Sequence, residues 1–278
     1  MTAANGTAAN GTIALTGSTG FIGQHVQSAA RALGYDVAVV GRDLHDVDTW
    51  RRAVDSGATR LIHLAFPSIR DRTQSDAMMS FVETSTAACA EALDGTSMHV
   101  VLVSSAAVVG PNDVIVDEDT DCAPANDYGR AKLAQERALT AEANRGGWPL
   151  TIARVFNVLG PGQPPGLLAT DLIARFATLA ESGSNAPIEL FPMESRRDYV
   201  DVREVADRVF RLPEGTFNLC SGEATRSLDL AIRLCHRFGI DPTRLQPAEG
   251  AGGVPYSCGN PSKLTAAGLE MTINWRDS

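Results

Sequence analysis

A tyrosine and a lysine capable of proton-transfer chemistry stand four residues apart in the middle of the sequence. Tyr128 and Lys132 open a helical pattern that runs to about Asn144, so they share one helix face, about 6 Å apart along its axis. The apolar run before this helix ends in two serines, Ser104 and Ser105. A phenol, an ammonium group and a hydroxyl together can orient a carbonyl group and give its oxygen a proton. A Tyr-x-x-x-Lys pair alone also occurs on solvated helix faces, so its meaning depends on the elements around it.

The pKa of the phenol decides whether this chemistry works near neutral pH. An unperturbed tyrosine has a pKa near 10, and lowering it by ~3 units requires about 4 kcal/mol of preferential stabilisation of the phenolate. The ammonium group of Lys132, one helical turn away, can supply stabilisation of that kind. We therefore expect Lys132 to lower the pKa of Tyr128.

A glycine-rich turn near the start of the chain supplies a second signal. It reads TGSTGFIG over residues 16–23, between a short apolar run and a helical pattern. Gly17 permits a tight turn, Gly20 lets backbone amides approach a pyrophosphate, and Gly23 lets the helix pack close to the strand. The free N–H groups at the helix start favour an anion. This order predicts dinucleotide binding rather than a glycine-rich surface turn. The predicted contacts are Gly17, Thr19, Gly20, Phe21, Ile22 and Gly23.

The end of the next apolar run indicates which dinucleotide. Residues 36–40 form a buried-type strand, and NAD-binding versions of this fold place an acidic residue at its end, on the ribose hydroxyls. Here that position is Gly41, followed by Arg42. A guanidinium group pairs with a 2′-phosphate that a carboxylate would repel. The sequence therefore favours NADP(H) over NAD(H), the alternative being that Arg42 is a solvated loop charge.

Asp46 has two interpretations. An aspartate that follows a third strand of such a fold can accept a hydrogen bond from the adenine amino group, which would make Asp46 a cofactor contact. The segment 42–46 is very short for a strand, and a helical pattern follows at 48–56. Asp46 or Asp48 is equally suited to cap that helix.

Two further apolar runs predict buried strands whose carboxyl ends line the cofactor cleft. In the run at 60–65, Leu64 and Ala65 lie at that end and are predicted cofactor contacts. His63 lies inside the run, so we expect a core histidine rather than a catalytic one. The run at 98–105 ends in the two serines, which either face the ligand or cap the following turn.

Composition excludes several classes of function. The chain has 278 residues, is 44% hydrophobic and carries a formal charge of −9, with a pI of about 5.0 and no basic patch, so nucleic-acid binding is disfavoured. No run of about 18 apolar residues predicts a membrane span. The five cysteines include no C-x-x-C pair, which indicates reduced thiols and a cytoplasmic protein. Without a P-loop, a Gly-x-Ser-x-Gly elbow or a His-Glu-x-x-His motif, we predict no metal site and no kinase or hydrolase activity.

These signals predict an α/β fold, a Rossmann-type doubly wound parallel sheet with a smaller C-terminal substrate-binding lobe. Residues 1–11 contain a tandem AANGT repeat and are expected to be a disordered leader. The dinucleotide-binding core is expected at 12–156. Residues 157–278 are expected to form mainly the substrate lobe, with 188–220 returning strands and a helix to the core. Glycine and proline crowd 160–166 and 250–255, which predicts mobile loops over the ligand.

The chain resembles the short-chain dehydrogenase/reductase superfamily, in particular its extended branch of nucleotide-sugar epimerases, dehydratases and reductases. The resemblance covers roughly residues 12 to 270. It rests on TGSTGFIG, His63-Leu-Ala, SSAAVVG from Ser104, YGRAK from Tyr128, RVFNVLGPG from Arg154 and RDYVDV from Arg197. The short span between Arg42 and His63 is similar to the compact 4-ketoreductases that make deoxysugars.

The resemblance implies roles for individual residues. The catalytic set is Ser105, Tyr128 and Lys132, where Ser105 orients the carbonyl group and Lys132 also holds the nicotinamide ribose. The implied nicotinamide neighbours are Phe156 and Val158, and the implied substrate contacts are Ser104, Ser105, Asn157 and Arg197, the last of which grips a diphosphate. A tyrosine usual before Gly110 is Val109 here, a departure that puts the shape of the sugar pocket in doubt.

The activity implied is that of an NADPH-dependent ketoreductase of a nucleotide-linked sugar, with a dTDP-4-keto-6-deoxy sugar as the expected substrate. A nucleotide-sugar epimerase or dehydratase with bound NAD, a reductase of a non-sugar ketone and a non-catalytic NADP-sensing protein stay open as alternatives. The resemblance also implies a homodimer formed through the helical segments 76–93 and 128–144.

Overall fold

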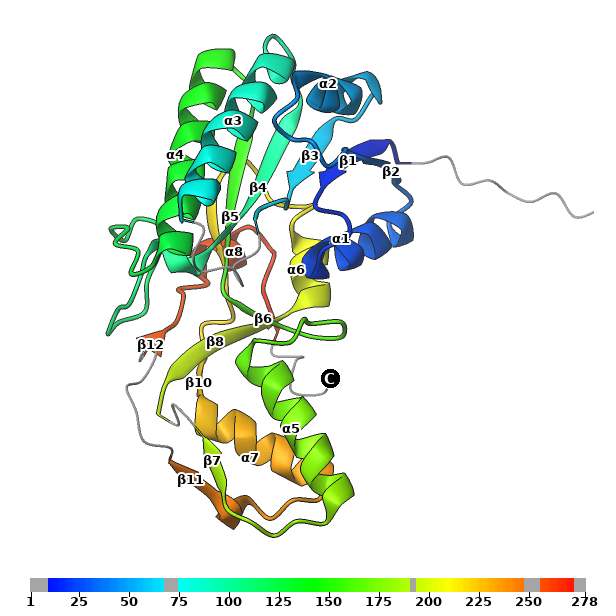
Figure 1. The fold of residues 1–278 in the computed structure, drawn as a ribbon. Coiled ribbons are helices and arrows are strands. Elements are labelled where there is room, and N and C mark those ends of the chain that lie inside the picture. The colour runs from blue at the N-terminus through cyan, green and yellow to red at the C-terminus, as the bar shows by residue number, and fades with distance from the viewer. Residues whose placement is uncertain (1–9, 68–74, 191–193, 248–255, 273–278) are drawn as a thin grey trace, which may run out of the picture.

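The computed structural model describes residues 10–67, 75–190, 194–247 and 256–272 (Figure 1). A parallel sheet of six strands has the order β2-β1-β3-β4-β5-β9. Its strands are β1 (Thr12–Thr16), β2 (Asp36–Val39), β3 (Arg60–His63), β4 (His99–Ser105), β5 (Leu150–Val155) and β9 (Gly215–Leu219). Helices α2 (Val47–Asp55), α3 (Ser75–Leu93) and α4 (Asp127–Gly146) cover one face, and α1 (Phe21–Ala32) and α6 (Val202–Arg208) cover the other. The predicted doubly wound sheet is confirmed.

Alternation along the strands explains why both faces are covered. In β1, Ile13 and Leu15 pack in one apolar core with Val26 of α1, whereas Ala14 belongs to a second core with Trp50 of α2. Successive side chains of a strand point to opposite faces, so an all-apolar strand needs a layer on each side.

The strand order places β1 beside β3, and this is where the order reverses. Crevices at such reversals, outside the carboxyl ends of the strands, are where doubly wound sheets bind ligands. No strand forms between β2 and β3, because residues 40–46 lead directly into α2 and the Trp50 indole donates a hydrogen bond to Leu44 O at 2.9 Å. The third strand on which the adenine role of Asp46 depended is therefore absent from this segment.

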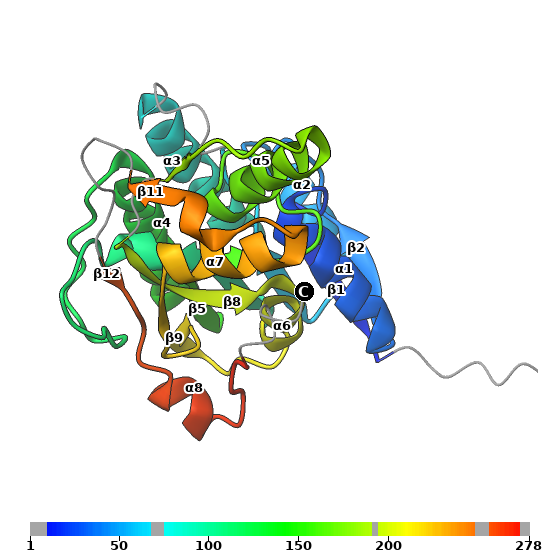
Figure 2. The same cartoon turned by 90° about the horizontal axis from the view of Figure 1, so that it is seen from below.

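A smaller lobe is built around β8 (Arg196–Asp201), which pairs with three short strands. These strands are β6 (Asn157–Leu159), β10 (Ala224–Arg226) and β12 (Tyr256–Ser257). Helices α5 (Leu168–Ser182) and α7 (Ser227–Phe238) lie over β8 in the view from below (Figure 2). Phe176 of α5, Leu230 of α7 and Tyr199 of β8 share one buried cluster, so the lobe has a core of its own.

The expected return of residues 188–220 to the main domain is only partly right. Strand β9 joins the large sheet and α6 packs on α1. However, β7 (Ile188–Leu190) stays in the lobe, where it pairs with β11 (Leu245–Pro247) after the 3-10 turn η2 (Pro242–Arg244). Ile188 is fully buried in the lobe cluster, which explains why this segment does not leave it.

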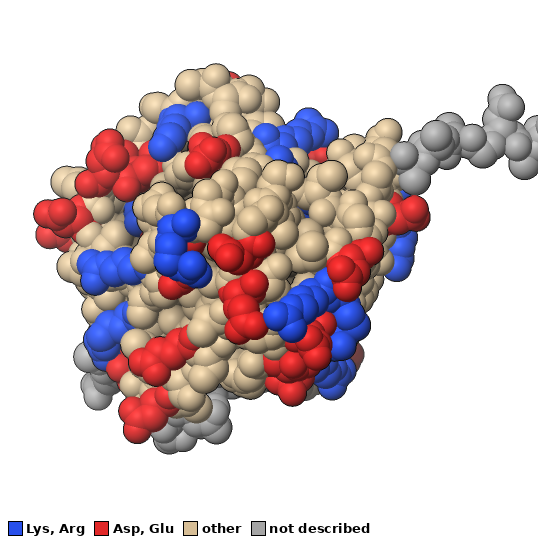
Figure 3. All heavy atoms as spheres, turned by 90° about the horizontal axis from the view of Figure 1, so that it is seen from above, with Lys and Arg blue, Asp and Glu red and all other residues tan. Residues whose placement is uncertain are grey.

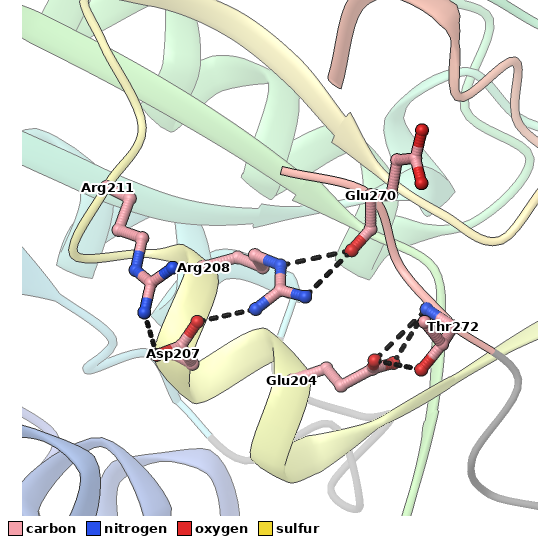
Figure 4. Close-up of polar contacts among 6 residues, drawn as sticks. All are labelled: Glu204, Asp207, Arg208, Arg211, Glu270 and Thr272. Atoms are coloured by element: carbon pink, nitrogen blue, oxygen red, sulfur yellow. Dashed lines mark hydrogen bonds and ion pairs between the residues drawn. The ribbon is translucent and has the colours of Figure 1, made fainter. Parts of the chain in front are cut away.

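The C-terminal part of the described chain returns to the main domain, which the sequence did not predict. Helix α8 (Ser262–Ala266) follows β12, and Leu264 lies in the same apolar core as β1. The chain is then held against α6 (Figure 4): Arg208 donates to Glu270 O at 3.1 and 2.8 Å, and the Thr272 amide donates to the Glu204 carboxylate. The C-terminal part of the described chain therefore packs on α6 and on the core beneath α1.

Two predicted segments lie wholly or partly outside the described residues. Residues 1–9 of the predicted leader and 248–255, which include the whole of the second glycine-rich loop, are not described. Within the leader, Asn10 and Gly11 are bonded to the sheet edge: Asn10 N donates to Gly34 O at 2.7 Å and Gly11 O accepts from Asp36 N at 3.0 Å. The leader boundary at residue 11 is therefore too late. Within the described parts, no helix is long and apolar enough to cross a membrane.

Candidate active site

The ends of β1 and β3 meet at the glycine turn. Gly17 has a φ of +68°, and a methyl group built on it would lie 2.7 Å from Ala65 N, so only glycine fits without a shift of backbone. A methyl group on Gly23 would overlap Gly17 O. The amides of Leu64 and Ala65 both donate to Thr16 Oγ1 at 3.1 Å, which fixes the two strand ends together. The predicted tight turn and close helix–strand packing are confirmed.

The start of α1 presents its backbone to this turn. Gly20 is the N-cap residue and has no side chain to bond the first amides of the helix. These amides have no acceptor within a helix, so they are free to bind an anion. A turn with glycine at both ends and uncapped helical N–H groups fits the pyrophosphate of a dinucleotide. The predicted cofactor contacts Thr19, Phe21 and Ile22 lie in this turn or in the first helical turn.

Two arginines lie at the end of β2, where the adenosine part of a dinucleotide belongs in this fold. Arg42 is exposed directly after Gly41. The Arg52 guanidinium comes from α2, donates to Thr49 Oγ1 at 2.8 Å, and lies 3.7 Å from where a methyl group on Gly41 would be. Arg52 was not predicted as a cofactor contact. It lies one helical turn after Thr49, and both side chains approach Gly41.

Asp46 lies close to these arginines as a helix cap. Its carboxylate accepts from Asp48 N at 3.1 Å and from Thr49 Oγ1 at 3.2 Å, at the N-cap position of α2. The capping interpretation is confirmed for Asp46. The interpretation as an adenine contact required a strand before Asp46, and no strand forms there.

Tyr128 and Ser105 are brought together by close packing at the start of α4. Asn126 caps α4 by accepting from Gly129 N at 2.8 Å, and a methyl group on Gly129 would lie 2.5 Å from Ala107 O. This approach sets the Tyr128 phenol in hydrogen-bond contact with the Ser105 hydroxyl. Ser105 also caps η1 (Ala106–Val108) by accepting from Ala107 N at 3.2 Å, so the capping interpretation is confirmed and its contact with a ligand stays a prediction.

The part of the electrostatic expectation for Tyr128 that was assigned to Lys132 is wrong. Burial raises the pKa of its phenol, and the hydrogen bond with Ser105 offsets only part of this effect. Lys132 is not among the groups that lower it. The reason is that the Lys132 ammonium is occupied elsewhere: it donates to Val103 O at 2.9 Å and to Gln135 Oε1 at 2.8 Å.

An aromatic ring connects the two side chains. The Phe66 ring meets the Tyr128 ring edge to face, with 5.6 Å between centroids, and the Lys132 Nζ lies 4.6 Å from the same Phe66 centroid. Phe66 directly follows Ala65, which contacts Gly17, so Tyr128 and Lys132 both lie at the carboxyl edge beside the glycine turn. Lys132 is 2% exposed, and burial lowers its pKa to about 7, opposed by the charge of Glu136.

Ser104 is not placed to bind substrate, which corrects the prediction. Its hydroxyl donates to Glu136 Oε1 at 2.5 Å, and the Glu136 carboxylate pairs with Arg154 at 2.9 Å, all three side chains being buried. Ser104 and Ser105 are neighbours in a strand and therefore face opposite sides of the sheet. Only Ser105 faces the phenol.

The predicted substrate contacts lie where the two lobes meet. Asn157, in β6, donates through Nδ2 to Asp198 O at 3.0 Å, and half-buried Arg197 lies beside it in β8. Phe156 is buried in a cluster that includes Val109, the departure noted in the sequence, whereas Val158 is half-buried against the main core. The roles of Phe156 and Val158 beside a nicotinamide stay predictions.

The prediction of a core histidine is confirmed. His63 is 2% exposed and is hydrogen-bonded to Thr16 and Gln135. Two residues of this region were missed: Phe66, which follows the His63-Leu-Ala segment, and Gln135, a polar residue on the buried face of α4 one turn after Lys132. No group of three or more side chains suited to hold a metal ion occurs among the residues that the structure describes.

Comparison with known proteins gives one family. A model of the NAD dependent epimerase/dehydratase family matches residues 13–218. GDP-6-deoxy-D-mannose reductase of Pseudomonas aeruginosa is 25% identical over 261 residues, which are 84% of this chain and 84% of that protein. The dTDP-L-rhamnose 4-epimerase of Burkholderia thailandensis is 33% identical over 144 residues, but these are 50% of this chain and 39% of that protein. The chain thus spans most of the reductase and less than half of the epimerase.

A solved structure has the same fold. The structure of RMD from Pseudomonas aeruginosa, complexed with NADPH, superposes with a TM-score of 0.87 at 22% identity, and the match covers 96% of this chain and 95% of that one. The likeness therefore extends over both lobes.

Proposed function

We propose that this chain, which belongs to the NAD dependent epimerase/dehydratase family, is an NADPH-dependent ketoreductase of a nucleotide-linked 4-keto-6-deoxy sugar. The observation that carries the proposal is the half-buried Tyr128, whose phenol is in hydrogen-bond contact with Ser105, at the carboxyl edge of the sheet that holds the glycine turn. A reductase needs a proton donor at the carbonyl oxygen. The raised pKa keeps this phenol protonated, which is the form that reduction uses.

The chain's own residues divide the work of reduction. A bound nicotinamide supplies the hydride that adds to the carbonyl carbon. Ser105 donates a hydrogen bond to the carbonyl oxygen and holds it next to Tyr128. As negative charge develops on that oxygen, Tyr128 Oη gives it the phenol proton, so the ketone becomes an alcohol and the phenolate takes up a proton afterwards. Lys132, beside Phe66, provides a positive charge near the site.

Two positions support NADP(H) over NAD(H). Gly41 leaves no carboxylate at the end of β2, Arg42 follows it directly in the sequence, and Arg52 of α2 lies close to it in space. No ion pair of either guanidinium occurs among the described residues. A 2′-phosphate would supply the missing negative charge. The matched structure that holds NADPH is consistent with this choice.

The substrate class is inferred from the lobe boundary and the relatives. Arg197 and Asn157 lie on adjacent strands there, which suits a diphosphate and its sugar, as the resemblance implies. Relatives include proteins named for dTDP-linked and for GDP-linked 6-deoxy sugars. We take a dTDP-linked 4-keto-6-deoxy sugar as the substrate, with the GDP-linked sugar as the second to test.

A nucleotide-sugar 4-epimerase is the second candidate, because several relatives are named as 4-epimerases of dTDP- or UDP-linked sugars. An epimerase returns the hydride to its substrate and needs no external supply of reduced cofactor. The uncapped turn and the Tyr128 site serve either reaction. Arg42 and Arg52 favour the reductase, since a reductase exchanges NADPH for NADP⁺ in each cycle.

One assay separates the two. Purified protein is mixed with NADPH and, in turn, with the dTDP-linked and GDP-linked 4-keto-6-deoxy sugars, and loss of NADPH absorbance is followed. Stoichiometric oxidation with either sugar supports the reductase. If several nucleotide keto sugars give no oxidation and NAD is released when the purified protein is denatured, the epimerase replaces it.

We also propose a homodimer formed through α3 and α4. A shallow hollow between these helices is lined by small and charged side chains, namely Ala87, Ala90, Glu91, Asp94, Glu142 and Arg145. Viewed from above, acidic and basic side chains are interspersed over this end of the molecule (Figure 3). Small residues allow helices to approach closely, and mixed charges suit a self-complementary contact. Analytical ultracentrifugation that finds only monomer at micromolar concentration rules this out.

A further inference from the structure

A line of buried polar side chains runs from the proposed site into the centre of the sheet. Lys132 Nζ bonds Gln135 Oε1 at 2.8 Å, Gln135 Nε2 lies 3.1 Å from His63 Nε2, and His63 Nδ1 lies 2.7 Å from Thr16 Oγ1. Exposure is 2% for Lys132 and His63 and 0% for Gln135 and Thr16. Apart from the positive charge of Lys132, no part of this line enters the proton transfer described above.

The lysine fixes the direction of every hydrogen bond in this line. An ammonium group only donates, so Gln135 must turn its Oε1 toward Lys132 and its NH₂ toward His63. His63 Nε2 then accepts, which places the proton of the neutral imidazole on Nδ1. That proton points at Thr16 Oγ1, 2.7 Å away, and shares the two lone pairs of this oxygen with the longer contacts from the amides of Leu64 and Ala65 at 3.1 Å.

His63 stays neutral in this position. Burial lowers its pKa to about 3, and the Lys132 charge acts in the same direction. Trp50 packs edge-on against the imidazole, with 5.3 Å between ring centroids, and excludes water on that side. The line therefore contains one titrating group near neutral pH, which is Lys132.

We propose that Gln135 is a positioning residue that orients the Lys132 ammonium and links it, through His63, to Thr16 at the strand end beside the glycine turn. The benefit of this role for catalysis rests on the proposed function, whereas the contacts of Gln135 with Lys132 and His63 are present in the protein without substrate. Because Gln135 is neutral, it orients the ammonium without neutralising it. The ammonium group of Lys132 is thereby bonded directly to two neutral acceptors, Gln135 Oε1 and Val103 O.

The titratable groups near Lys132 in the described residues are either bonded to other side chains or neutral, so Gln135 has the positioning role. On α4, Glu136 is held by Ser104 of β4 and by Arg154 of β5, so its charge is shared with a buried guanidinium. Tyr128, also on α4, is a neutral phenol with a raised pKa. On β3, His63 is neutral for the reason given above. Gln135 is thus the side chain that accepts directly from Lys132 among the described residues.

The sequence makes a direct test practical, because Lys132 and Lys263 are its only lysines. Protein labelled with ¹³C and ¹⁵N in lysine alone gives two side-chain signals by NMR, and K263R identifies the one from Lys132. Titrating this signal in the full chain without cofactor or substrate measures the protonation midpoint of Lys132. The same titration is repeated for Q135M, for Q135E and for the control L139M, on the same helix.

Opposite shifts are expected from the two substitutions. Q135M removes an acceptor from the ammonium form and lowers the midpoint by roughly one pH unit, whereas Q135E adds a negative charge and raises it by roughly one unit or more. L139M leaves it unchanged. In Q135E the carboxylate accepts from His63, so the imidazole proton moves from Nδ1 to Nε2, which histidine ¹⁵N shifts report.

Midpoints that stay unchanged, or that move in the same direction in both variants, overturn the proposal. Should Q135M fail to fold, as judged by thermal unfolding, Q135E alone decides through its midpoint and the His63 tautomer. Since the titration needs no turnover, failure of the proposed reaction and failure of this role are separate results. With turnover present, the alkaline limb of the rate profile shifts with the measured midpoints.

Discussion

The Tyr128 phenol is the group on which the proposed chemistry depends at the scale of single residues. It is half-buried, hydrogen-bonded to Ser105 and held as the protonated form by its raised pKa. Replacing Tyr128 with Phe removes the proton donor and keeps the ring against Phe66, so we expect turnover to fall by roughly 10²–10⁴-fold with cofactor binding unchanged. Steady-state kinetics and cofactor titration check this. Near-wild-type turnover of Tyr128→Phe would show that another group donates the proton.

Arg52 gives a second prediction at this scale. Its guanidinium has no ion-pair partner among the described residues and lies beside Gly41. A hydrogen bond to a charged group contributes about 1.5–3 kcal/mol, so Arg52→Ala should weaken NADP⁺ binding by roughly tenfold or more and leave NAD⁺ binding unchanged. Isothermal titration with both cofactors measures this selectivity.

The neighbouring Arg51 supplies the matched control. It lies on the same helix but is paired with Asp48 and Glu91, both at 3.0 Å. Arg51→Ala should leave both affinities unchanged. Equal weakening of NADP⁺ and NAD⁺ by Arg52→Ala would mean that Arg52 does not bind the 2′-phosphate.

The sequence predicted which residues gather at the site better than it predicted where they point. The spacing of Tyr128 and Lys132 correctly placed both on one helix face beside the glycine turn. It did not show that Lys132 bonds Val103 O, because that contact arises only when α4 packs on β4, nor that Gln135, three residues later on α4, accepts from the same ammonium. For the same reason, two adjacent serines gave no sign that Ser104 faces Glu136.

The turn between β1 and α1 is the element whose geometry matters most. Gly17→Ala combines a positive φ with an approach of 2.7 Å to Ala65 N, so the turn must move away from β3. We expect a loss of about 1–3 kcal/mol in the free energy of unfolding and a cofactor affinity lowered by at least tenfold. Urea unfolding and cofactor titration measure the two effects.

Gly57 provides a control that separates the effect of a positive φ from the effect of a close approach to another part of the chain. It has a φ of +73° with nothing within 4 Å of a built methyl group. Gly57→Ala should therefore cost stability without affecting cofactor binding. If Gly17→Ala binds cofactor as the wild type does, the turn is not the cofactor cradle.

At the scale of elements, long periodic segments were predictable and short ones were not. The main helices were expected to within a few residues, because apolar periodicity extends over several turns. The pairing of β7 with β11 and the return of α8 were missed. These elements have three to five residues, and their pairing is decided by contacts with distant parts of the chain rather than by local pattern.

The stability of the whole molecule should depend on pH through His63. Its pKa is about 3 in the folded protein and 6.5 ordinarily, so the unfolded chain binds a proton first as pH falls. The contribution of His63 is complete above about pH 6.5 and is lost progressively toward pH 3. We expect a loss of up to about 2 kcal/mol between pH 6.5 and about pH 5.

Urea unfolding at about pH 7 and about pH 5 measures this loss. His63→Gln cannot take up the proton and should show a smaller difference between the two pH values, whatever its stability at pH 7. Replacement of the exposed His236 by Gln is the control and should keep the wild-type difference. An unaltered difference in His63→Gln would contradict the buried, neutral imidazole on which the polar line from Lys132 depends.

The fate of the hydride tests the account as a whole. NADPH carrying deuterium at the transferable C4 position is incubated with the protein and a nucleotide-linked 4-keto-6-deoxy sugar, and the product is examined by NMR and mass spectrometry. The account predicts one deuterium at the former carbonyl carbon and one NADP⁺ formed for each alcohol. An isomerised sugar without deuterium, formed while the NADPH remains unoxidised, would contradict it.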